Sequence, residues 1–278
     1  MQVSFRNDKK TLYLVSTPIG NLEDITFRAV KTLQEVAVIF AEDTRVTSKL
    51  LNHYNISKEL ITYHDHNRHD GAKRVIELLE EGLDVALVSD AGTPGISDPG
   101  YELVNYVIEA GFNVVSIPGA SASITALTSS GLKMEPHLFV GFLPRKNSEI
   151  KSELEKILEV EATLIFYESP FRVKDTLNHL LDVLGDRKVA ISRELTKMFE
   201  TVIRTTLSEA ITMEHDTRGE YVIIVEGYIK KESNKTIEEL YLKYKDLELS
   251  EKDVFKKISL ELGVSKRDVY QKIKIDNK

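Results

Sequence analysis

Short apolar runs alternate with segments of helical periodicity through the first half of the chain. Runs rich in β-branched side chains predict buried strands, and apolar side chains spaced three and four residues apart predict amphipathic helices. Alternation of the two predicts a parallel sheet with right-handed crossovers. The strands are expected at Thr11–Ser16, Val36–Ala41, Leu60–Tyr63, Val85–Val88 and Asn113–Ile117, and the helices at Ile25–Glu35, through Leu50 and Tyr54, at Gly71–Glu81 and at Tyr101–Ala110.

Polar side chains at helix starts predict where two of these helices begin. Asp43 or Thr44 is expected to cap the helix through Leu50, and Asp70 the helix at Gly71–Glu81. Short side chains with a carboxylate or hydroxyl oxygen can accept a hydrogen bond from the free backbone N–H groups of a first turn.

The second half mixes strands and helices in a different order. Val189–Arg193 and Thr201–Thr206 leave little room for a helix between them, which predicts an antiparallel pair in a mixed sheet. The fold class is therefore α/β, with two α/β domains at residues 1–118 and 119–230, the first a parallel sheet with helices on both faces. The other strands are expected at His137–Phe142, Thr163–Tyr167 and Tyr221–Gly227, and the helices at Ser148–Val160, Phe171–Leu184 and Ser208–Glu214.

A helical extension is expected at residues 236–278, after a polar linker at residues 230–235. Val254, Ile258 and Leu262 follow helical spacing, and a break at residues 263–265 precedes the basic helix Lys266–Lys274. Helix, short glycine-containing turn and basic helix form a helix-turn-helix-like pattern. The pattern fits either contact with nucleic acid or a small helical cap with a solvated basic face.

Composition narrows the classes of function. The 278 residues carry a net charge of −7 and a pI near 5.6, which argues against non-specific coating of nucleic acid. The absence of cysteine excludes disulfides, thiolate catalysis and Cys-ligated metal. No apolar run approaches the roughly 18 residues of a membrane span, and the N-terminus lacks the pattern of a signal peptide. We expect a cytoplasmic protein with no membrane partner.

A loop rich in glycine and proline, residues 89–100, follows the strand Val85–Val88. Ligands of open α/β sheets bind outside the carboxyl ends of strands, although a long surface turn is the plain alternative. The first strand ends in STPIGN rather than GxGxxG, and no GxxxxGK[ST] occurs, which weighs against ATP, GTP and NAD(P). The loops suit an uncharged or zwitterionic ligand, with Asp90 placed to take an ammonium or hydroxyl group.

His64, His66 and His69 with Asp65 form a polar cluster that raises the possibility of a metal site. A closed metal site needs more ligands and a second shell. We therefore predict no metal and interpret the cluster as a polar loop lining a cleft, with a solvated loop as the alternative.

Seven motifs in a fixed order carry a family resemblance. They are LVSTPIGNLEDITFRA (14–29), AEDTR (41–45), VSDAGTPGISDPG (88–100), IPGASA (117–122), GFLPRK (141–146), FYESPFR (166–172) and ISRELTK (191–197). Together they closely resemble the tetrapyrrole methylase superfamily of S-adenosylmethionine-dependent enzymes, and within it the methyltransferases of small-subunit ribosomal RNA. The resemblance covers about residues 11–230, and the basic tail matches the C-terminal extension of those enzymes.

The resemblance implies an enzyme that methylates the ribose 2′-oxygen of cytidine 1402 in the 16S rRNA of the 30S subunit. It also implies two α/β domains with S-adenosylmethionine as cofactor bent in the cleft between them, a homodimer, and no DNA partner. Carried over residue by residue, the donor-binding positions are Pro18, Asp90, Gly92, Thr93, Ser121, Ala122, Phe142, Tyr167, Leu195, Tyr221 and Val222.

Catalysis by such an enzyme needs alignment of the reacting atoms, helped by a base that takes the proton of the weakly nucleophilic hydroxyl. Among bases at strand ends, Asp43, His64, His66 and Glu168, we assign catalytic roles to Asp43 and His64, together with Arg45. The plain alternatives are that Asp43 is only a helix cap and that Glu168 is only a turn residue or half of an ion pair. The cations expected to hold RNA phosphates are Arg145, Lys146, Arg172, Lys197, Lys266 and Arg267.

Two other classes of function stay open. A methylase of a tetrapyrrole or another small molecule fits the same fold, but needs neither the basic tail nor the cationic loops. A non-catalytic module that binds an adenosine ligand or RNA also fits, because the sequence does not identify the base.

Overall fold

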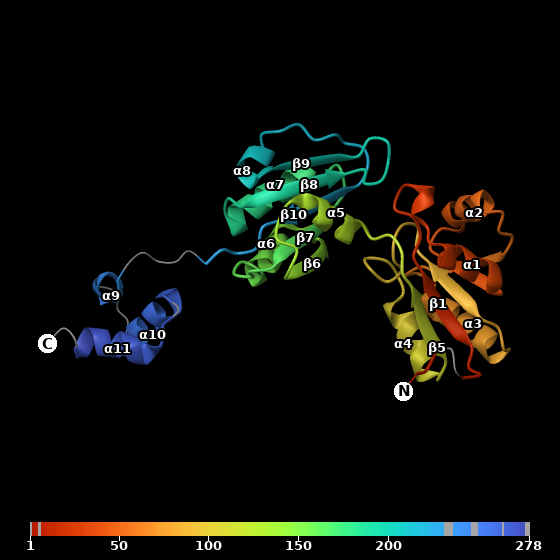
Figure 1. The fold of residues 1–278 in the computed structure, drawn as a ribbon, viewed down its shortest axis with the longest axis horizontal. Helices are drawn as coiled ribbons and strands as arrows, with labels where there is room; N and C mark the ends of the chain where they lie inside the picture. The colour runs from red at the N-terminus through yellow and green to blue at the C-terminus, as the bar shows by residue number, and fades with distance from the viewer. Residues whose placement is uncertain (1, 5–6, 231–235, 246–249, 263, 276–278) are drawn as a thin grey trace. The chain divides into compact units, whose positions relative to one another are not determined.

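The computed structural model describes residues 2–4, 7–230, 236–245, 250–262 and 264–275 (Figure 1). The chain divides into two compact units, Met1–Tyr228 and Ile229–Lys278, and each is described by itself.

The first sheet is parallel throughout, in the strand order β3-β2-β4-β1-β5. Helices α1 and α2 pack on one face through Leu33 and Leu51, and α3 and α4 on the other through Leu78 and Leu103. The predicted parallel sheet with helices on both faces is confirmed. Its elements are β1 (Thr11–Val15), η1 (Leu22–Asp24), α1 (Phe27–Glu35), β2 (Val38–Ala41), α2 (Thr44–His53), β3 (Glu59–Thr62), α3 (Arg68–Glu80), β4 (Val85–Val88), α4 (Tyr101–Glu109) and β5 (Asn113–Ile117).

Polar side chains near the N-termini of α2 and α3 determine where these two helices begin. Asp43 caps α2 as predicted, because its carboxylate accepts the backbone N–H of Arg45. The prediction that Asp70 caps α3 is wrong, since α3 already begins at Arg68. The Asn67 amide fixes the preceding turn by accepting the His64 N–H and donating to the Thr62 carbonyl, so the helix starts earlier.

The second sheet is mixed, in the order β6-β7-β10-β8-β9. Only β6 and β7 pair in parallel, and the predicted antiparallel pair is confirmed as β8 and β9. Its elements are α5 (Ala122–Ser130), β6 (His137–Phe142), α6 (Asn147–Lys156), β7 (Thr163–Glu168), α7 (Val173–Leu184), β8 (Lys188–Arg193), β9 (Thr201–Thr206), α8 (Leu207–Ala210) and β10 (Tyr221–Val225).

Two apolar clusters cover the faces of this second sheet. Helices α6, α7 and α8 pack on one face, with Leu154 and Leu177 fully buried. The other face is covered by α5, and Ile19 from the loop after β1 packs into the same cluster beside Leu195. A side chain of the first sheet's loops therefore completes the core of the second sheet. The proposed domain boundary at residue 118 itself stays a prediction.

The second unit contains three helices among its described residues, α9 (Ile237–Lys245), α10 (Glu251–Leu262) and α11 (Lys266–Lys274). They enclose a small core that includes Leu240, Ile258 and Val269. Ser265 and Asp268 form a capping box at the start of α11. Gly263, predicted to break the chain, lies outside the described residues. Within the described chain, no helix has the length and apolarity needed to cross a membrane.

Candidate functional site

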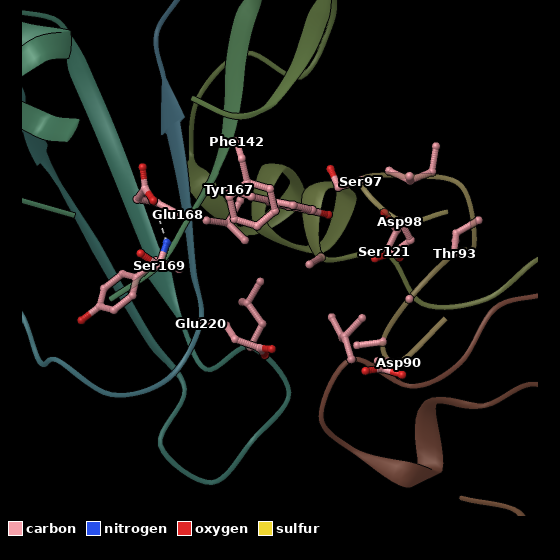
Figure 2. A pocket seen from close by; sticks show the side chains of 18 of the residues that line it. Asp90, Thr93, Ser97, Asp98, Ser121, Phe142, Tyr167, Glu168, Ser169 and Glu220 are labelled. Carbon is pink, nitrogen blue, oxygen red and sulfur yellow. Dashed lines mark hydrogen bonds between the residues drawn. The ribbon is translucent and has the colours of Figure 1, made fainter. Parts of the chain in front are cut away.

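A cavity of about 470 Å³ opens beyond the carboxyl ends of the first sheet's strands and is closed by loops and strand ends of the second sheet (Figure 2). Small-molecule sites typically occupy roughly 300–1,000 Å³. The lining residues are Ile19, Glu42, Asp90, Ala91, Gly92, Thr93, Ile96, Ser97, Asp98, Ser121, Ala122, Phe142, Tyr167, Glu168, Ser169, Pro170, Leu195, Gly219, Glu220, Tyr221 and Val222.

The loops after β1, β4 and β5 are joined to form the floor of the cavity. Thr17 and Gly92 exchange both backbone hydrogen bonds, at 2.8 and 3.1 Å, and the hydroxyls of Ser16 and Thr93 lie 3.0 Å apart. Gly92 has a φ of 85°, a conformation that favours glycine. A Cβ on Gly119 would lie 2.7 Å from the Cβ of Ser16, so glycine permits this approach. The small residues of the motifs therefore bring three strand ends together.

Ten of the eleven predicted donor-binding residues line this cavity. From the first sheet and α5 these are Asp90, Gly92, Thr93, Ser121 and Ala122. Pro18, the eleventh, is buried between Thr17 and Ile19 in the floor loop and does not line the cavity. Although the structure brings the ten residues together, their contacts with a donor stay predictions.

An aromatic wall from the second sheet faces this floor. The rings of Phe142 and Tyr167 lie edge to face with centroids 5.6 Å apart, and the Tyr167 hydroxyl accepts the backbone N–H of Ser123 at 3.0 Å. Figure 2 shows the Tyr167 hydroxyl directed toward the side that carries Ser121 and Asp98. The predicted donor-binding residues Leu195, Tyr221 and Val222 complete this wall. The wall offers flat apolar surfaces of the kind that hold a planar heterocycle.

Carboxylates dominate the charge of the cavity. Glu42, Asp90, Asp98, Glu168 and Glu220 line it, whereas the described lining residues include no lysine, arginine or histidine. Burial, and then the nearby carboxylates of Glu42 and Asp90, raise the pKa of Asp98 to about 7. Burial also raises the pKa of Glu42 and Asp90. Such a site favours a cationic ligand. The attraction between its positive charge and the carboxylates offsets the free energy that the carboxylates lose when they are removed from water.

The predicted catalytic residues Asp43 and Arg45 lie beside the cavity rather than in its lining. The Asp43 carboxylate accepts the Arg45 backbone N–H at 2.8 Å and pairs with its guanidinium at 2.6 Å. These hydrogen bonds lower the pKa of Asp43 to about 2. The Asp43 backbone N–H in turn donates to the Asp90 carboxylate at 3.1 Å. Asp43 is thus a helix cap linked to the cavity, and its catalytic role stays a prediction.

His64, the third predicted catalytic residue, follows β3 and also lies outside the cavity lining. Its Nδ1 atom is buried with no hydrogen-bond partner among the described residues, and its ring packs against His66 at 5.9 Å. Within the described chain, no group of three or more His, Asp or Glu side chains is arranged to hold a metal.

Glu168, a further candidate base, is buried at the end of β7. One carboxylate oxygen accepts the Ser169 backbone N–H at 2.8 Å, and the other accepts the Thr176 hydroxyl at 2.6 Å. Arg172 lies 3.6 Å away and donates to the carbonyls of Leu143 and Pro144. Glu168 and Arg172 therefore brace the loops of the aromatic wall.

The other cations that were predicted to bind RNA differ in how exposed they are and in whether they already form ion pairs. Arg145 and Lys146 are exposed in the loop before α6, where Lys146 pairs with Glu149 at 3.0 Å. Lys197 is partly buried between Glu194 and Glu220, at 2.8 and 2.9 Å. Lys266 and Arg267 begin α11 in the second unit. None of these positions by itself shows contact with RNA.

Sequence reasoning missed several lining residues, including Glu42, Ser97, Asp98 and Glu220. Asp98 stands inside the SDPG string, so its motif was visible although its burial was not. Ser97 has a φ of 65°, and its hydroxyl would lie 3.4 Å from a Cβ on Gly141 of β6. This contact between the floor loop and the aromatic wall has no signal in a single sequence.

The fold is that of the tetrapyrrole methylase class of methyltransferases. The family model described as Tetrapyrrole (Corrin/Porphyrin) Methylases matches residues 11–211. Solved structures of similar fold include a cobalt precorrin-4 methyltransferase, with a TM-score of 0.60 and 17% identity over 78% of this chain and 94% of that one. Diphthine synthase is similar, with a TM-score of 0.60 and 14% identity over 78% and 90% of the two chains.

Curated relatives are much closer in sequence. Ribosomal RNA small subunit methyltransferase I of Halalkalibacterium halodurans is 50% identical over 95% of both chains, and that of Bacillus subtilis is 45% identical over 97% and 96%. The protein of the same name from Haemophilus influenzae is 48% identical over 81% of this chain and 82% of its own. The chain belongs to the tetrapyrrole methylase family and, within it, to the ribosomal RNA small subunit methyltransferase I family.

The methyl donor of this family is S-adenosylmethionine, as the sequence predicted. The cavity fits it in three respects. Its volume suits a ligand of this size, its carboxylates suit the sulfonium and ammonium charges, and its aromatic wall suits an adenine ring.

Proposed function

We propose that this enzyme methylates the ribose 2′-oxygen of cytidine 1402 in the 16S rRNA of the 30S subunit. The observation that carries the proposal is the match to relatives named ribosomal RNA small subunit methyltransferase I over nearly the whole chain. The target nucleotide and atom come from the motif resemblance. A ribosomal substrate implies work in the cytoplasm, and the resemblance supports a homodimer.

We propose that the donor occupies the acidic cavity against its ten predicted lining residues, with Pro18 supporting the floor beneath it. Asp98 joins them as the carboxylate that takes the donor's ammonium group. It combines partial burial in the floor loop with a position facing Tyr167 and Ser121 (Figure 2). When bound, S-adenosylmethionine supplies an electrophilic methyl group attached to a positively charged sulfur.

The protein's contribution is to align the ribose hydroxyl with that methyl group and to take up the hydroxyl proton. We propose that Arg45, Arg145 and Lys146 hold RNA phosphates, because these cations are exposed near the cavity-lining loops. Asp43 orients Arg45 through their paired hydrogen bonds. Arg172 and Lys197 are proposed to hold the loops in place and not to bind RNA, because Arg172 already donates to backbone carbonyls and Lys197 already pairs with carboxylates. Lys266 and Arg267 are proposed to add phosphate contacts from the second unit.

The test is methyl transfer from labelled S-adenosylmethionine by the purified full chain. We expect label in the 16S rRNA of 30S subunits that lack this modification, and none on precorrin or uroporphyrinogen substrates. Label on the tetrapyrroles with none on rRNA would favour a small-molecule methylase. Tight donor binding without transfer to either would favour a non-catalytic module.

A further inference from the structure

The carboxylates of the cavity differ in how far they are already engaged. Glu168 uses both oxygens for hydrogen bonds, to Ser169 and Thr176. Glu220 pairs with Lys197 at 2.9 Å, and Asp90 accepts the Asp43 backbone N–H. With Asp98 assigned to the donor, Glu42 is the lining carboxylate that remains. Among the described residues, none donates a hydrogen bond to its side chain.

Glu42 is fixed at the carboxyl edge of the first sheet by strand register. It follows Ala41, the last residue of β2, and Ala41 pairs with Val88, the last residue of β4. Glu42 therefore lies beside the start of the floor loop and lines the cavity while half-buried. Glu42 is one of the residues that line the cavity, whereas the carboxylate of the next residue, Asp43, pairs with Arg45 outside the lining.

We propose that Glu42 is the general base that accepts the proton of the ribose 2′-hydroxyl. The assignment rests on the proposed function. As the 2′-oxygen forms its bond to the methyl carbon, the bond from carbon to sulfur breaks and its electron pair stays on sulfur, which becomes a neutral thioether. The hydroxyl proton passes to the Glu42 carboxylate and leaves to solvent after the products depart.

The surroundings of Glu42 support this role. Burial raises its pKa, and the carboxylates of Asp90, Asp65 and Asp43 raise it further, while His64 lowers it. Asp98 is a further charged neighbour, and burial, followed by the charge of Glu42, raises its pKa. A carboxylate with a raised pKa is a stronger proton acceptor than an ordinary one and stays ionised above that pKa. Asp43, with a pKa of about 2, is a far weaker acceptor.

The test compares wild type with Glu42→Gln and Glu42→Asp in single-turnover methylation of 30S subunits at saturating enzyme and donor. Glu42→Gln should slow the chemical step about 100-fold, since general bases contribute on the order of 10²–10⁴-fold. Glu42→Asp should recover part of the rate. The matched control is Glu35→Gln, the same change at an exposed ion pair with Lys31, which should leave the rate unchanged.

Two further readouts separate a base from a structural or donor-binding residue. Donor affinity and thermal stability of Glu42→Gln should match those of wild type within about threefold and about 2 °C. The wild-type rate should rise with pH and then level off, whereas the Glu42→Gln rate should keep rising with hydroxide concentration. Equal rates and pH profiles, or a loss confined to donor affinity, would overturn the role of Glu42 alone. No transfer to 16S rRNA by wild type would overturn the proposed function and this role with it.

Discussion

Asp43 and Asp98 both lie in loops at the carboxyl edge of the first sheet, yet their surroundings differ sharply. Asp43 stands at a helix start, where the backbone and guanidinium of Arg45 lower its pKa to about 2. Asp98 stands in the cavity floor, where burial and the charges of Glu42 and Asp90 raise its pKa to about 7. The same type of side chain therefore caps a helix in one loop and lines the cavity with a raised pKa in the other.

The difference shows that a place at a strand end determines where a carboxylate lies but not which hydrogen bonds it makes. A parallel sheet brings such residues to one edge, but neighbouring donors decide whether a carboxylate is already satisfied. Asp43 has hydrogen bonds and an ion pair with Arg45, whereas Asp98 has a side-chain hydrogen bond with Ser89 and no lysine, arginine or histidine among the described lining residues beside it. We therefore propose that Asp98 binds the donor, whereas Asp43 caps α2.

The largest expected effect is on donor binding by Asp98→Asn. Removing this charge should weaken S-adenosylmethionine binding by about 100-fold, because a buried charge-assisted hydrogen bond to the ammonium group is lost. Isothermal titration calorimetry measures the affinity, with Asp43→Asn as the matched control. If both variants lost donor affinity equally, the proposed difference between Asp98 as a donor ligand and Asp43 as a helix cap would be contradicted.

Glu168 extends the comparison to a buried carboxylate that is fully hydrogen-bonded. Thr176→Val removes the hydroxyl that donates to it at 2.6 Å and should lower the free energy of unfolding by about 2 kcal/mol. Chemical denaturation measures the loss. Thr128→Val, at an exposed residue of α5, is the control and should cost far less. An unchanged stability in Thr176→Val would show that Glu168 does not depend on this bond.

The pH dependence of donor binding sharpens the contrast further. Asp98 is neutral below its pKa of about 7 and charged above it, so donor affinity should rise as pH increases from 6 to 7.5, by up to about tenfold. The donor's ammonium stays largely protonated over this range. Titrations at several pH values should show the rise in wild type and a flat profile in Asp98→Asn. A flat wild-type profile would contradict the electrostatic account of the floor.

The smallest effect is expected from Asp43→Ala. Loss of the helix cap should lower the melting temperature by about 2–4 °C, because the first turn of α2 loses its side-chain acceptor. Differential scanning calorimetry measures the shift, and donor affinity should stay within about threefold of wild type. A large loss of donor affinity would move Asp43 from the scaffold into the binding site.

Strand periodicity, which is a local signal, predicted the two sheets, and the family resemblance supplied ten of the 21 residues that line the cavity. The sequence did not predict burial of Glu42 and Asp98, which depends on strand register and on contact between the Ser97 loop and β6. Asn67 shows the same limit on a smaller scale, since its amide moves the start of α3 away from Asp70. Local sequence patterns determine helices and strands, whereas the burial and pKa of a titratable group depend on residues that are distant in the sequence.

Mapping the transferred methyl group on the RNA tests the proposed function most directly. 16S rRNA is extracted from 30S subunits after incubation with the enzyme and S-adenosylmethionine, and is then cleaved with alkali. A methylated 2′-oxygen blocks cleavage at its own nucleotide. We expect one new alkali-resistant position, at cytidine 1402. A methyl group on a base, at another nucleotide or on no nucleotide of 16S rRNA would contradict the proposed function.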